Sequence, residues 1–140
     1  MTKIKNDYQL AASKTWLREF EEALKEAEQD SELTPRLRDA HVDSIQSQMR
    51  DLESEIEEYE RIKDTPPQEM SIASLEELPE SLVRLRIAKD MTQADLASKL
   101  GIKQQQIQKW EASSYERAAY ATVLKVAKAL GVEIEGRVVR

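Results

Sequence analysis

Cysteine is absent from the 140 residues, glycine occurs three times, and aromatic side chains make up only 5% of the chain. Without cysteine the chain has neither disulfide bonds nor thiolate metal sites. Few glycines and aromatics beside 34% charged residues favour long exposed helices over sheets. No apolar run approaches the roughly 18 residues that span a bilayer, and the first ten residues lack the apolar core of a signal peptide. We therefore expect an all-α cytoplasmic protein without membrane contact or cofactor.

Catalytic patterns are also missing. The single histidine, His41, has no cysteine beside it, and Asp39 and Asp43 lie two positions away, off its helical face. A solvated histidine is therefore expected rather than a metal ligand. The five glutamates between positions 53 and 60 point all round a helix, so they do not form a general acid–base pair. With no glycine-rich phosphate loop either, we expect a protein that is not an enzyme.

Charge is divided unevenly along the chain. Residues 1–78 hold 10 Lys and Arg against 20 Asp and Glu, a net charge of −10, whereas residues 79–140 hold 11 against 7, a net charge of +4. The basic half can approach phosphates, and the acidic half would be repelled by DNA and would suit a basic partner. A chain of this length has room for a small domain plus an appendage with a separate role.

The first 64 residues have the pattern of an acidic antiparallel helical hairpin. Apolar or small residues recur at a 3-4-3-4-3 spacing in two stretches, about 8–29 and 35–63; they are Leu10, Ser13, Leu17, Phe20, Leu24 and Ala27, then Val42, Ile45, Met49, Leu52, Ile56 and Tyr59. Thr34 and Pro35 suit the start of the second helix. Since a two-helix hairpin buries little surface, we expect dimerisation or a partner to complete it. The alternative is a rigid spacer.

Residues 65–78 are predicted to be a linker, and residues 132–140 a strand. Thr65 to Gln68 contains two prolines that end the second helix, and Ser74 with Glu77 has the spacing of a capping box. The tail alternates apolar and charged residues, which predicts a strand. Two tails paired antiparallel through Val132, Ile134 and Val138 would give a two-fold dimer. The alternative is a frayed end.

Residues 79–131 are predicted to form four to five short helices. The first runs from about 79 to 89 and the last from about 122 to 130. Between them, Thr92 caps the second helix, Gly101 ends it with a positive φ, and Ile107 is the buried residue of the third.

The third of these helices carries polar residues on its outer side. With Ile107 inward, helical phase turns outward Gln104, Gln105, Gln108 and Lys109. Glutamine bonds adenine bidentately in the major groove, and lysine reaches guanine or a phosphate. This arrangement predicts a sequence-specific reader of double-stranded DNA, with Gln104 and Gln105 first because base contacts come from the start of such a helix. The alternative is a solvated face.

The segment 82–131 resembles the phage-repressor (XRE) helix-turn-helix family. The resemblance is carried by Leu85-Arg86, Met91-Thr92-Gln93, Leu96-Ala97, Leu100-Gly101-Ile102, Ile107, Trp110-Glu111 and Leu130-Gly131-Val132. It implies that Gln93 contacts a phosphate and braces the recognition helix, and that Gln104, Gln105 and Lys109 contact DNA. The chain departs from the family at Lys103, where many members have a small capping residue, so Lys103 is expected to meet a phosphate. It departs again in the loop 112–117, whose expected phosphate donors are Ser113, Ser114, Tyr115 and Arg117.

An acidic hairpin joined to such a domain resembles HigA-type antitoxins. With two paired tails, we expect a homodimeric repressor on a palindromic operator, located with the nucleoid. The resemblance implies a small basic RNase as partner, HigB-like, whose operon the pair represses. Two alternatives stay open. One is a stand-alone regulator whose hairpin only dimerises or spaces the DNA-binding domains, and the other is a protein-interaction role without DNA binding.

Overall fold

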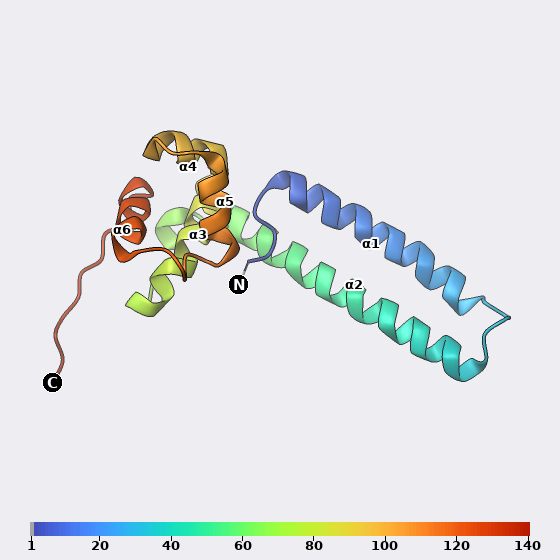
Figure 1. Ribbon diagram of the computed structural model, residues 1–140. Helices are drawn as coiled ribbons and strands as arrows, with labels where there is room; N and C mark the ends of the chain where they lie inside the picture. The colour runs from blue at the N-terminus through green and yellow to red at the C-terminus, as the bar shows by residue number, and fades with distance from the viewer. Residues whose placement is uncertain (1) are drawn as a thin grey trace. The chain divides into compact units, whose positions relative to one another are not determined.

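The computed structural model describes residues 2–140, and all of its regular secondary structure is helical (Figure 1). This part of the chain forms six α-helices and two 3-10 turns, with no β-strand. It divides into two compact units, residues 2–61 and residues 62–140. None of the described helices is both long and apolar enough to cross a bilayer. The predicted all-α class is confirmed.

The first unit is the predicted hairpin. Helix α1 (Asp7–Glu28) and helix α2 (Pro35–Asp64) run antiparallel and are joined by a short turn (Figure 1). The side chain of Asn6 begins α1 by accepting a 2.7 Å hydrogen bond from the Gln9 amide. Thr34 begins α2 in the same way, since its hydroxyl accepts a 3.3 Å hydrogen bond from the Leu37 amide. Both helices lie within one residue of their predicted bounds.

The apolar stripes along α1 and α2, which we call the seams, lie where the 3-4 spacing predicted them. Ser13 and Ala27 of α1 and Ile45, Ile56 and Tyr59 of α2 are buried. The Tyr59 hydroxyl donates a 2.8 Å hydrogen bond to the carboxylate of Asp7, which ties the open end of the hairpin.

Residues 2–4 lie within the predicted hairpin although they precede its first helix. Thr2 and Ile4 are both only 3% exposed. Lys3 forms an ion pair with Glu55 of α2 at 3.4 Å. These residues have no helical periodicity, so only their position against α2 reveals their role.

The linker contains two 3-10 turns, η1 (Pro67–Glu69) and η2 (Leu75–Glu77). The predicted capping box of Ser74 and Glu77 is wrong. The Glu77 amide, which the serine hydroxyl was expected to bind, instead donates to the Ser74 carbonyl at 3.2 Å and closes the 3-10 turn. The Glu77 carboxylate accepts a 3.1 Å hydrogen bond from Ala73.

The second unit holds the four predicted short helices. They are α3 (Leu78–Ala88), α4 (Gln93–Leu100), α5 (Gln104–Ala112) and α6 (Tyr120–Ala129), the last beginning two residues earlier than predicted. Their core contains side chains at most 1% exposed, among them Leu82, Leu96, Ile107, Val126 and Leu130. Each helix therefore contributes to one shared apolar core, which fixes the orientation of α5.

The predicted strand over residues 132–140 is not present in the described chain. The Val132 amide donates to the Ala127 carbonyl at 2.9 Å as part of the end of α6, and the tail then continues without regular structure. Ile134 is 47% exposed and Val138 fully exposed. An alternating pattern gives a strand only beside another strand, and the described chain offers none.

Candidate nucleic-acid interface

Helix α4 begins with a reciprocal cap. The Asp95 amide donates to the Thr92 hydroxyl and the Thr92 amide donates to the Asp95 carboxylate, both at 2.9 Å. The hydrogen bond from the backbone of Thr92, followed by that from its side chain, lowers the pKa of Asp95 below its usual range. The charged carboxylate also favours the positive end of the helix. This cap fixes the residue at which α4 begins.

The turn between α4 and α5 has the conformation that the sequence predicts. Gly101 has φ +68°, and the Ile102 amide reaches back to the Ala97 carbonyl at 3.0 Å. Only glycine adopts this left-handed conformation without strain. Lys103 precedes α5 without a side-chain hydrogen bond to the helix, as the departure from the family pattern predicts. Its ammonium group is therefore free of a capping role.

The exposed face of α5 carries the residues selected from helical phase. Ile107 is 0% exposed, and the residues on the opposite side are all exposed, namely Gln104, Gln105, Gln108 and Lys109. Lys99 in the last turn of α4 and Lys103 directly before α5 are exposed as well. The arrangement presents amide groups, which bond base edges, beside ammonium groups, which bond phosphates.

A buried ion pair locks α5 to the rest of the domain. The Arg86 guanidinium of α3 donates to both carboxylate oxygens of Glu111, at 2.6 Å and 2.8 Å, and to the Met91 carbonyl at 2.8 Å. Arg86 is 2% exposed and Glu111 is 1% exposed. Bidentate geometry and the additional carbonyl satisfy the charges away from water. The ion pair therefore fixes α3, and through the Met91 carbonyl the start of the α4 segment, against α5.

Gln93 joins this pair from the start of α4. Its side-chain amide donates to Glu111 at 3.0 Å, and the residue is 5% exposed. The family resemblance implies that Gln93 braces α5, and its hydrogen bond to Glu111 is a contact that can do so. The roles of Arg86 and Glu111 were missed, although each lies four residues after a buried apolar residue, Leu82 and Ile107 respectively. The sequence did offer a signal for this pair: a positive and a negative side chain each lie on the same helical face as a core residue.

The loop after α5 differs from its prediction. Ser114 and Tyr115 take left-handed conformations, with φ +51° and +60°, and are 5% and 1% exposed. Tyr115 packs against Trp110 with ring centroids 6.2 Å apart, and burial raises the pKa of its hydroxyl. These two side chains therefore form core beneath the loop and are not presented to a phosphate. Ser113 is half-buried with its hydroxyl on the Trp110 carbonyl at 3.2 Å, and Arg117 is exposed.

No group of His, Cys, Asp or Glu side chains in the described residues is arranged to hold a metal ion. The chemistry that this surface offers is hydrogen bonding and charge, from α5 and the residues that adjoin it.

A comparison with protein families matches residues 82–136 to the helix-turn-helix family. The match begins within α3 and includes α4, α5 and α6, whereas the hairpin lies outside it. No curated protein matches the chain, and no solved structure matches it. The family match supports an XRE-type helix-turn-helix domain in this segment, and with it a DNA-binding transcriptional regulator.

Proposed function

We propose that the protein is a sequence-specific repressor that also acts as the antitoxin of a type II toxin–antitoxin pair. In this proposal it represses its own operon and neutralises a HigB-like RNase. The observation that carries the DNA-binding part is the glutamine face of α5, held in place by the buried contacts among Arg86, Glu111 and Gln93. A fixed helix can place side chains on base edges at little entropic cost.

In this proposal α5 lies in the major groove of DNA. Gln104 and Gln105 contact bases, because the start of a recognition helix lies deepest in the groove. The remaining contacts hold phosphates or support the base contacts, and come from Gln93, Lys103, Gln108, Lys109, Ser113 and Arg117. Ser114 and Gln93 are both only 5% exposed, so Ser114 is omitted and Gln93 is given the supporting role through Glu111 in place of a phosphate contact. Phosphate contacts give affinity without sequence preference, and the base contacts supply the preference.

The operator is proposed to be palindromic and the repressor to be a two-fold dimer through the tail residues Val132, Ile134 and Val138. Deleting residues 133–140 should then give a monomer that keeps its helical content, because these residues lie outside the helical core. Sedimentation velocity and circular dichroism measure the two properties.

A truncated protein that still sediments as a dimer would place the contact elsewhere. The candidates in the described chain are the hairpin and the outer side of α6, where Tyr120 is 74% and Leu124 45% exposed.

The antitoxin part rests on the acidic hairpin and its charge. Residues 1–78 carry a net charge of −10, which suits a small basic toxin and repels DNA phosphates. Removing residues 1–70 should spare operator binding but abolish rescue of growth from any small basic toxin that is encoded beside this chain. The full chain is the positive control, and operator binding by the truncated protein shows that it is folded.

Full rescue by the truncated protein would move the toxin contact into the helix-turn-helix domain. Failure of the full chain to rescue would favour the second candidate, a stand-alone regulator whose hairpin spaces or pairs the DNA-binding domains.

A further inference from the structure

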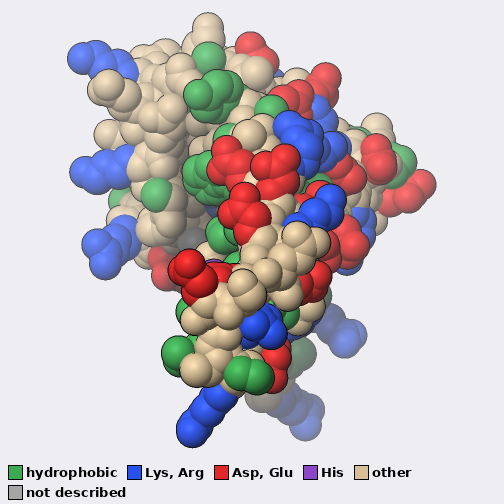
Figure 2. All heavy atoms as spheres, turned by 90° about the vertical axis from the view of Figure 1, so that its right-hand side faces the viewer, with side chains coloured by type: hydrophobic (Ala, Val, Ile, Leu, Met, Phe, Trp, Pro, Cys, Tyr) green, Lys and Arg blue, Asp and Glu red, His purple; other side chains and the backbone are tan. Residues whose placement is uncertain are grey.

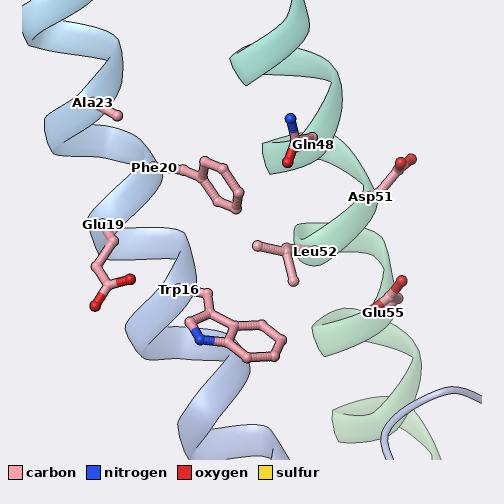
Figure 3. Close-up of a pocket in the computed structure, with 8 residues that line it drawn as sticks. All are labelled: Trp16, Glu19, Phe20, Ala23, Gln48, Asp51, Leu52 and Glu55. Carbon is pink, nitrogen blue, oxygen red and sulfur yellow. The ribbon is translucent and has the colours of Figure 1, made fainter.

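A groove of about 600 Å³ lies between α1 and α2 of the hairpin (Figure 3). Its lining repeats one pattern on both helices, at positions i, i+3, i+4 and i+7; the residues are Trp16, Glu19, Phe20 and Ala23 on α1, and Gln48, Asp51, Leu52 and Glu55 on α2. Phe20 and Leu52 point toward one another across the groove, and Trp16 lies beside them (Figure 3). Along this stretch the side chains of the two helices thus leave the space between them unfilled.

The floor of the groove is apolar and open to water. Trp16 is 56% exposed, and Phe20 and Leu52 are only half-buried although both belong to the predicted seams. Singly exposed apolar residues need no explanation, whereas a contiguous exposed apolar surface with a polar border is typical of an interaction site. The groove therefore has the character of a surface that another apolar group covers.

The border of the groove is acidic. Glu19, Asp51 and Glu55 line it, and no Lys or Arg does. Glu55 is paired with Lys3 at 3.4 Å, whereas Glu19 and Asp51 have no ion-pair partner within residues 2–140. Acidic side chains are prominent over the hairpin in the space-filling view (Figure 2). A partner that covers the floor therefore gains by carrying positive charge at its edges.

We propose that this groove binds a basic amphipathic helix of a partner protein. From Trp16 to Ala23 the lining extends about 10 Å along α1, which is two helical turns, so it matches the apolar stripe of a helix laid into a groove. A second hairpin is a poorer occupant, because residues 2–61 carry 9 Lys and Arg against 16 Asp and Glu and would repel their copy. The groove and its charge do not depend on the proposed function. Only the identification of the partner as the toxin rests on it.

The probe is a labelled synthetic peptide of about 15 residues, long enough to cover the two turns of the groove when it is helical. It carries leucine at i, i+3, i+4 and i+7 and lysine elsewhere, and its binding to the full chain is followed by fluorescence anisotropy. The double variant Glu19→Lys/Asp51→Lys should weaken binding by roughly tenfold or more. The matched control, Glu21→Lys/Glu53→Lys, makes the same change of charge at exposed positions of the same helices outside the groove, and should weaken binding about twofold or less.

Trp16 supplies a second measurement in the same titration. The bound peptide should shield it from acrylamide quenching, and this protection should disappear in Trp16→Phe. Equal losses from the two pairs of charge reversals would overturn the proposal, since they would show a general attraction to the acidic hairpin. The proposal would also be overturned if a peptide with glutamate in place of lysine bound as tightly as the lysine peptide. The same holds if self-association of the chain protected Trp16 from quenching when no peptide is present.

The outcome is separable from that of the proposed function. Rescue from the toxin that survives Glu19→Lys/Asp51→Lys would exclude the groove while leaving the antitoxin role in place. Peptide binding as described, combined with failure of the full chain to rescue growth, would keep the groove and reject the antitoxin role.

Discussion

Replacing Glu111 by glutamine is expected to destabilise the helix-turn-helix domain by roughly 3–5 kcal/mol, because it leaves the Arg86 guanidinium buried without its counter-charge. The shape of the side chain is kept, so the effect comes from the lost charge and from disturbed hydrogen bonds to Arg86 and Gln93. Urea denaturation followed by Trp110 fluorescence in a Trp16→Phe background measures it. Glu116→Gln removes a charge from an exposed position nearby and is the control. A loss below about 1 kcal/mol would mean that the ion pair does not hold the domain.

The double variant Arg86→Met/Glu111→Leu separates stability from positioning. Removing both charges together restores much of the stability in buried pairs of this kind. Gln93 would nevertheless lose its acceptor on Glu111, so α5 would be braced less firmly. We therefore expect a folded domain with reduced preference for its operator.

Gln104→Ala and Gln105→Ala should each weaken binding to the operator by roughly 1–3 kcal/mol, and binding to random DNA by much less. Both side chains are exposed at the start of α5 and take no part in the core, so the loss reports contacts to bases and not stability. Fluorescence anisotropy with operator and random duplexes of equal length measures the difference. Lys103→Ala is the contrast, because a lost phosphate contact weakens both duplexes alike. Equal losses on both duplexes for the glutamine variants would show that they do not read bases.

Much of the fold follows from local patterns in the sequence. The 3-4 spacing predicted both seams of the hairpin, and the Thr92 cap with Gly101 predicted the bounds of α4. Burial of Ile107 then determined which residues of α5 point outward, without any knowledge of tertiary contacts. These features depend on residues close together along the chain, which is why periodicity and capping rules suffice for them.

The features that were missed depend on contacts between distant segments. Arg86 and Glu111 are 25 residues apart. Helical phase places each side chain on a core face, but only the tertiary fold shows that the two meet. The left-handed conformations at Ser114 and Tyr115 lack the glycine that usually marks them. Spacing likewise identifies the faces of α1 and α2 but not the distance between them, and the depth of the groove beside Trp16 depends on that distance. The tail pattern predicted a strand whose partner a single chain does not supply.

Selection of duplexes from a random-sequence library by the full chain tests the central claim most directly, because it assumes no operator. The account predicts enrichment of a two-fold symmetric motif whose half-sites lie about 34–36 Å apart, or a multiple of that distance. Enrichment should be lost in Gln104→Ala/Gln105→Ala. Retention of duplexes without any common motif, at an affinity that falls with salt alike for all of them, would contradict sequence-specific recognition by α5.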